Sequence, residues 1–136
     1  MIDKIEIIKR ANGCCEYCKY PASFSPAPFV MEHIIPLSRG GDDAVENMAF
    51  ACSGCNGHKY AKTSALDPLT REVVALYHPR NQKWNAHFQW SPDKVSVEGI
   101  TATGRATIEA LHLNRPEVVN FRKIAMLIGK HPPVEG

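Results

Sequence analysis

Two cysteine pairs with the same internal spacing carry the clearest chemistry in this sequence. The pairs are Cys15-x-x-Cys18 and Cys52-x-x-Cys55. Two residues between cysteines allow both thiolates to face one ion, and four thiolates make a tetrahedral zinc site. The 33 residues between the pairs, 19 to 51, exceed the common spacing of a zinc ribbon. We therefore predict a structural Zn²⁺ site with a whole substructure inserted between its two halves.

Other uses of the cysteines stay open at this point. A redox Cys-x-x-Cys usually occurs once, beside a strand-helix unit, and the cysteines can also be buried by coincidence. Cys14 is the fifth cysteine, and we expect it to pack in the interior, with Cys14-x-x-x-Cys18 as an alternative ligand pair. Disulfides are a weaker interpretation, because the first ten residues mix charged and apolar side chains, unlike an export signal.

Three polar residues near the cysteine pairs suit the cutting of a phosphodiester. His33 is a candidate general base, because an imidazole titrates near neutrality and can take a proton from water. Glu32 and Asn56 offer carboxylate and amide oxygens, which are the hard ligands that Mg²⁺ and Mn²⁺ prefer. Neighbouring strand residues point to opposite faces, so Glu32 and His33 can serve one phosphate only where the strand ends or twists. Ile34-Ile35-Pro36, followed by a glycine loop, favours such a distortion.

The stretch from Cys15 to Lys59 resembles the HNH nuclease family. In that family a first strand carries an acid-His pair, the loop or second strand an Asn or His, and the helix a His or Asn. These three positions are matched in order by His33, by Asn47 and by either Asn56 or His58. Many members also have two Cys-x-x-Cys pairs around this core, and Cys55-Asn56-x-x-Lys59 is similar to the family's common helix start. The resemblance covers about a third of the chain.

The resemblance implies a ββα-metal fold and a role for each matched residue. His33 would be the general base, and Glu32 and Asn56 would bind the catalytic Mg²⁺ or Mn²⁺. Asn47 would position the loop or the backbone of His33, while His58 would be a third ligand or a phosphate contact. We favour Asn56 over His58 as the third catalytic residue, because Asn56 follows the cysteine pair immediately. The family often has Asp where this chain has Glu32, and the longer side chain can alter the metal preference.

Net charge does not identify a partner for this protein. The formal charge is +2, and four thiolates with one zinc ion would add −4 and +2, which cancels it. Affinity for nucleic acid must therefore come from local cations, and the candidates are Arg39, Lys59, Lys62 and the later Arg and Lys residues, with Arg39 and Lys59 as the expected contacts. We expect DNA as the partner, with RNA as an alternative, no membrane partner, a monomer or homodimer, and a cytoplasmic location. No base-reading helix is identifiable, so we expect weak or no sequence specificity.

The length of 136 residues fits one globular domain over residues 1–136. We expect its nuclease core at about 12–62 and a C-terminal extension at about 67–131. The expected fold class is α+β: a ββα-metal HNH core braced by a four-cysteine zinc site, with a C-terminal hairpin and two helices.

Local patterns predict the elements of the N-terminal half. A helix is expected over 2–11, with Ile2, Ile5 and Ile8 at helical spacing and Asn12-Gly13 as a left-handed stop. The proline-rich segment 21–28 should be a surface loop. Strands are expected at 29–35 and 48–51, followed by a helix that begins at Ser53 or Cys55.

The C-terminal half should begin with a turn at 67–70 and a strand at 72–77. Residues 84–90 and 95–100 predict a hairpin with an aromatic face, and a helix should follow through 103–113. Asn114-Arg115-Pro116-Glu117 should open a last helix that ends at Gly129. Its expected apolar face consists of Val118, Val119, Ile124, Leu127 and Ile128.

These expectations favour a metal-dependent endonuclease that hydrolyses DNA phosphodiester bonds, nicking one strand with His33 as its base. The alternative is a non-catalytic zinc module that binds nucleic acid or protein, and a third interpretation is a zinc-stabilised scaffold. Binding alone requires none of Glu32, His33, Asn47 and Asn56, so their joint presence favours the nuclease.

Overall fold

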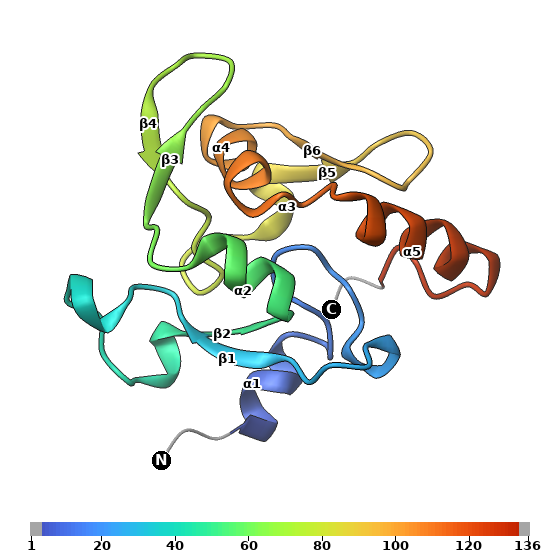
Figure 1. Cartoon of the computed structure of the whole chain (residues 1–136), viewed down its shortest axis with the longest axis horizontal. Helices are drawn as coiled ribbons and strands as arrows, with labels where there is room; N and C mark the ends of the chain where they lie inside the picture. The colour runs from blue at the N-terminus through green and yellow to red at the C-terminus, as the bar shows by residue number, and fades with distance from the viewer. Residues whose placement is uncertain (1–3, 134–136) are drawn as a thin grey trace.

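The computed structural model describes residues 4–133. Within these residues the chain forms five α-helices and three separate two-stranded antiparallel hairpins (Figure 1). The helices are α1 (Lys4–Arg10), α2 (Ser53–Lys59), α3 (Trp84–His87), α4 (Ala102–Leu111) and α5 (Pro116–Leu127). The strands are β1 (Val30–His33), β2 (Met48–Ala51), β3 (Ser64–Leu66), β4 (Val73–Ala75), β5 (Phe88–Trp90) and β6 (Val97–Gly99). The short 3₁₀ helices are η1 (Ala22–Phe24), η2 (Leu37–Arg39) and η3 (Val45–Asn47). The predicted α+β class is confirmed.

A hairpin and one helix make the unit that the HNH resemblance predicts. Strands β1 and β2 are antiparallel, in a register that runs from Val30 opposite Ala51 to His33 opposite Met48. Helix α2 starts directly after β2, because Cys52 is extended and its sulfur accepts a hydrogen bond from the Cys55 amide. Figure 1 shows α2 and α1 on opposite sides of this hairpin. The predicted order of strand, loop, strand and helix is confirmed.

Helix α1 buries a different face from the one expected. Ile5 is 71% exposed and Ile8 is 38% exposed, whereas Ile7 is fully buried. The prediction of an Ile5 and Ile8 face is therefore wrong, and Ile2 lies outside the described residues. Ile7 and Ala11 stand four residues apart, so both face β2 and pack in one cluster with its apolar side chains. The left-handed stop at Asn12 and Gly13 is confirmed by their positive φ angles.

The later hairpins differ in part from the expected elements. Strand β4 lies inside the predicted strand at 72–77, but its partner β3 was not predicted. Hairpin β5–β6 is present, although residues 84–87 form α3 instead of the first half of a strand. In this region the ring of Trp84 packs against those of Phe88 and Trp90. The proline-rich segment 21–28 is irregular apart from η1.

The last two helices begin close to where they were predicted. Thr101 caps α4 by accepting a hydrogen bond from the Gly104 amide at 3.0 Å, and Pro116 occupies the first turn of α5. The expected apolar face of α5 is wrong in its second half. There Ile124, Leu127 and Ile128 are 61%, 86% and 58% exposed.

Helix α5 instead turns an arginine inward. Its buried residues are Val118, Arg122 and Ala125, and Arg122 is only 2% exposed. The two Nη atoms of Arg122 donate to Val95 O, Asn114 Oδ1, Cys18 O and Leu113 O at 2.9 to 3.2 Å, whereas its Nε has no partner within the described residues. The apolar face of α5 was predicted from the spacing of apolar residues alone. The Arg122 guanidinium can be buried because backbone and side-chain acceptors surround it, and the spacing does not show these acceptors.

One hydrophobic cluster joins the two halves of the chain. It includes the four paired cysteines, Trp84 and Phe88 from the middle, and Leu111, Leu113 and Val118 near α4 and α5. The C-terminal extension therefore completes the core around the cysteines. Among the described residues, no helix is long and apolar enough to span a membrane.

Candidate active site and metal centre

The four paired cysteines come together in the interior. Cys15, Cys18 and Cys55 are at most 1% exposed, and Cys52 is 8% exposed. Their four sulfur atoms all lie within 4.8 Å of one another, and no disulfide joins them. The sulfurs of Cys18 and Cys52 are 3.7 Å apart.

This geometry fits a tetrahedral zinc ion. Thiolates at about 2.3 Å from zinc have sulfur atoms about 3.8 Å apart along each edge of the tetrahedron. The donor set is also the one that structural zinc uses. Cys14 is buried outside this group, so the pairing of Cys15 with Cys18 holds and the alternative pairing from Cys14 does not.

Arg115, at the start of α5, lies against the cysteine cluster. Its guanidinium donates to the sulfur of Cys52 at 3.3 Å and to that of Cys55 at 3.6 Å. Burial opposes the charge of Arg115, but the nearby thiolates, Cys55 first, outweigh it and raise the pKa of Arg115. Gly54 leaves room for this contact, because a Cβ there would lie 2.6 Å from Nη2 of Arg115. Sequence reasoning missed Arg115, since no local pattern marks a residue 60 positions from Cys55.

A second site is an open hollow of about 340 Å³ between β1 and α2. Its wall includes Glu32 and His33 from the end of β1 and Asn56 and Tyr60 from α2. Pro36 and Leu37 close it on the side of the following loop. Three of the residues predicted to do chemistry are therefore brought to one cavity.

Asn47 holds the loop that follows His33. Its Oδ1 accepts from the Ile35 amide at 2.9 Å, and its Nδ2 donates to Ile35 O and Asp42 O at 2.9 and 2.8 Å. Gly41 lies so close to Ile35 O that any Cβ would collide with it. Asn47 is 9% exposed and all its polar atoms are used within the protein. This arrangement suits a positioning residue that does not itself touch substrate.

Glu32 is buried and held from two sides. Its Oε1 accepts from the Tyr17 hydroxyl, and Lys59 Nζ lies 3.1 Å from Oε2. Burial raises the pKa of Glu32, while the charge of Lys59 and the hydrogen bond from Tyr17 act in the other direction.

Lys59 is buried between α2 and β1, which the sequence pattern did not predict. It is 1% exposed, and its ammonium also donates to Ile34 O at 2.9 Å. Lys59 was expected to contact nucleic acid, and the structure encloses its ammonium between Glu32 and backbone carbonyls. It instead ties the end of α2 to β1.

His33 contacts an acid that sequence reasoning missed. Its Nε2 lies 2.7 Å from Oδ1 of Asp43, whose side chain is 73% exposed. An ionised carboxylate only accepts hydrogen bonds, so Nε2 carries the hydrogen and Nδ1 is the basic atom of the neutral ring. The only signal for Asp43 was its position in the turn-rich Gly40-Gly41-Asp42-Asp43 segment that folds back beside β1.

The structure separates the two candidates for the third catalytic position. Asn56 lines the hollow, and its side-chain amide makes no hydrogen bond within residues 4–133. His58 lies two residues further, about 200° around the helix. It is exposed, and its ring centre is 4.3 Å from that of His112. The structure therefore does not bring His58 to the hollow, contrary to its expected catalytic role.

Arg39 is the remaining predicted contact. It is exposed on η2, next to the hollow's wall at Leu37, and its Nε donates to Ala61 O at 2.9 Å. Its position leaves the guanidinium on the surface.

A scan against protein families places this site in a known class. Residues 15–62 match the model described as HNH endonuclease, a segment that begins at the first paired cysteine and ends just after α2. The chain therefore carries an HNH endonuclease domain, as its resemblance predicted. A search of curated proteins and a search of solved structures gave no match.

Glu32 and Asn56 line this hollow, and a carboxylate and an amide oxygen are the kinds of donor that a hard divalent cation prefers. Glu32 offers a carboxylate with lone pairs beyond its two hydrogen bonds, and Asn56 offers a free amide oxygen. The four-cysteine group is the only cluster of three or more metal-binding side chains of the His, Cys, Asp and Glu types in the described part of the chain. Two oxygen ligands nevertheless suffice for Mg²⁺, which usually keeps waters and substrate phosphate as its other ligands.

Proposed function

We propose that this protein is a metal-dependent endonuclease that hydrolyses DNA phosphodiester bonds with weak or no sequence specificity. The observation that carries the proposal is the shared hollow of Glu32, His33 and Asn56 inside the segment that matches the HNH family. A role in binding alone does not require these three polar groups to lie together beside the loop that Asn47 holds in place.

In the proposed reaction, His33 activates a water molecule. Nδ1 of His33 takes a proton from the water, whose oxygen attacks phosphorus while the bond to the 3′ oxygen breaks. Asp43 holds the ring through Nε2 and stabilises the imidazolium that forms. The leaving 3′ oxygen takes a proton from a second water molecule, so the products are a 3′ hydroxyl and a 5′ phosphate, as the family resemblance implies.

Other residues would prepare the substrate for this step. A Mg²⁺ or Mn²⁺ ion held by Glu32 and Asn56 would offset the charge that grows on the phosphate and the leaving oxygen. Asn47 would keep the loop after His33 in place, and exposed Arg39 would contact a backbone phosphate. One such site cuts one strand, so cleavage of both strands would require two copies or two binding events.

The direct test is nicking of supercoiled plasmid by zinc-loaded protein with added Mg²⁺ or Mn²⁺. We expect cleavage by the wild type and none by His33→Ala. Equal nicking by both proteins, or by neither, would refute the assignment. Tight plasmid binding without cleavage under any divalent metal would instead favour a non-catalytic zinc module.

The same assay decides the third catalytic position. Asn56→Ala should lose cleavage, whereas His58→Ala should keep it, because only Asn56 lines the hollow. The two substitutions lie on the same helix, so circular dichroism and zinc content provide a common check of folding. Loss of cleavage by His58→Ala alone would reverse this choice.

The zinc ion is proposed to be structural. Metal binding and folding are coupled in small sites, so Cys52→Ser should yield an unfolded or aggregating product. Elemental analysis of the wild type should find one zinc per chain. A folded wild type without zinc would contradict this role. The hydrophobic cluster shared by both halves supports one domain over the whole chain.

A further inference from the structure

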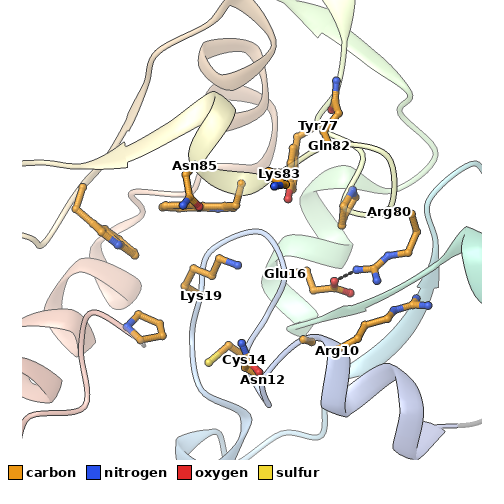
Figure 2. Close-up of a pocket in the computed structure, with 15 residues that line it drawn as sticks. Arg10, Asn12, Cys14, Glu16, Lys19, Tyr77, Arg80, Gln82, Lys83 and Asn85 are labelled. Carbon is orange, nitrogen blue, oxygen red and sulfur yellow. Dashed lines mark ion pairs between the residues drawn. The ribbon is translucent and has the colours of Figure 1, made fainter. Parts of the chain in front are cut away.

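A larger hollow, of about 510 Å³, lies apart from the nuclease site (Figure 2). Its wall is made by the end of α1, the turn of the first cysteine pair and the segment from Tyr77 to Trp90. It shares no lining residue with the hollow that contains His33. We call it the basic pocket, defined by Arg10, Lys19, Arg80 and Lys83 with Glu16 at its wall.

The charge of the basic pocket is strongly one-sided. Four cationic side chains line it, and among its described lining residues the only acid is Glu16. Glu16 is already engaged, because it forms an ion pair with Arg80, drawn as the dashed line in Figure 2, and accepts from the Phe50 amide at 2.8 Å. One carboxylate therefore faces four cations.

The two arginines are held in place by the protein, Arg80 by its ion pair with Glu16 and Arg10 by backbone carbonyls with Glu6 and Glu46 nearby. Arg10 donates to Val45 O at 2.9 Å and to Met48 O, which fixes its guanidinium at the edge of β2. Neither Arg10 Nε nor Arg80 Nε has a hydrogen-bond partner within the described chain. Burial and the charge of Arg10 lower the pKa of Arg80 to about 10. An anion in the pocket would be attracted by these cationic side chains and could accept a hydrogen bond from the buried Nε atoms.

Lys19 and Lys83 are the other two cationic side chains of the basic pocket. Lys19 Nζ lies 5.3 Å from the ring centre of Trp84, whose indole N–H is used by Tyr17 O at 3.1 Å. Lys83 is exposed and precedes α3, and Figure 2 shows both lysines beside the hollow. Arginine and lysine together are the side chains that proteins use for phosphate.

We propose that the basic pocket binds a phosphate group, carried either by nucleic acid or by a free phosphate compound. The pocket is built largely from residues 77–90, which lie outside the segment that matches the HNH family. The nucleic-acid source rests on the proposed nuclease function, and it would give the substrate a second anchoring point away from the scissile bond. The free-phosphate source does not depend on that function.

The test measures binding of a short fluorescent DNA duplex by anisotropy, in a His33→Ala background so that the probe stays intact. Lys83→Glu should weaken binding about tenfold and reduce the slope of log affinity against log salt by about 1 or more. Lys83→Arg should bind as the parent does. Lys130→Glu is the matched control, because Lys130 is exposed and does not line the pocket.

A parallel titration with inorganic phosphate, followed by NMR, identifies the source. Phosphate binding that Lys83→Glu abolishes, with unchanged duplex affinity, assigns the pocket to free phosphate compounds. Equal effects of Lys83→Glu and Lys130→Glu on the duplex, with no phosphate binding, would overturn the proposal. That result would leave the proposed nuclease function untouched if the wild type still nicks plasmid. Conversely, a protein that binds phosphate in the pocket but does not nick plasmid would refute the nuclease function and not the pocket.

Discussion

Lys59 Nζ lies 3.1 Å from Oε2 of Glu32, and both side chains are buried. The ion pair links the last turn of α2 to the strand that carries His33. Lys59 also donates to Ile34 O, so a single ammonium fastens the helix at the point where β1 leaves its partner. The alignment of Asn56 with His33 across the hollow depends on this fastening.

Replacing Lys59 should therefore destabilise the fold. Lys59→Met leaves the Glu32 carboxylate buried with only the Tyr17 hydroxyl, which should cost about 3–5 kcal/mol of unfolding free energy. Urea unfolding of zinc-loaded protein measures the change. The double variant Lys59→Met with Glu32→Gln should recover part of the loss, because it removes the unpaired charge. A single variant as stable as the wild type would contradict this account.

Asp43→Asn should slow cleavage without unfolding the protein. The amide cannot stabilise an imidazolium as a carboxylate does, so we expect kcat to fall about tenfold or more, within the ~10²–10⁴ range of general-base catalysis. KM should change little. Asp42→Asn is the matched control, because the Asp42 carboxylate accepts from the Ala44 amide at 3.0 Å, whereas it is Asp43 that contacts His33. Equal kcat losses in both variants would point to a general loop effect.

Arg115→Ala should weaken zinc binding. Removing a group that hydrogen-bonds metal ligands typically costs about 10–100-fold in affinity. Competition with a chromophoric chelator measures this directly. Arg115→Lys keeps the charge but loses the two-pronged contact with Cys52 and Cys55, so it should fall between the alanine variant and the wild type. Unchanged chelator competition by Arg115→Ala would show that the thiolates do not depend on it.

Asp67 should stabilise the fold down to acidic pH. It is fully buried and accepts two hydrogen bonds from Arg105, each 2.9 Å long, which hold the pKa of Asp67 well below its ordinary value. A depressed pKa gives stability that is fully present above the unfolded-state pKa, about 3.9, and is lost as the pH falls towards the native pKa. Asp67→Asn should lower the Tm by an amount that stays constant from neutral pH to about pH 5. A difference that shrinks within that range would contradict the assignment.

The grouping of the four cysteines and of the candidate site residues was largely predictable because these residues lie close together in sequence. The two-residue spacing within each of the pairs Cys15–Cys18 and Cys52–Cys55 is a local pattern that indicates one metal site without knowledge of the rest of the fold. The order of acid, histidine and asparagine likewise follows the strand and helix that carry them. Turn residues and prolines marked the element boundaries for the same local reason, as Pro116 shows at the start of α5.

Long-range contacts were not predictable from local patterns. Arg115, Arg122 and Lys59 look like surface cations in the sequence, yet each is buried or nearly so by acceptors brought from distant segments. Asp43 was passed over because turn residues are common and only the folded loop shows which of them faces His33.

The contact of Arg115 with the sulfurs of Cys52 and Cys55 determines how short a fragment can keep the HNH segment intact. A transplanted fragment of residues 15–62 would carry every residue that resembles the HNH family, but it would leave behind the guanidinium over its thiolates and the aromatic wall at Trp84. Such a fragment would expose apolar surface that the whole chain covers. Fusions that use the HNH segment should therefore keep the chain through α5 and attach partners outside it.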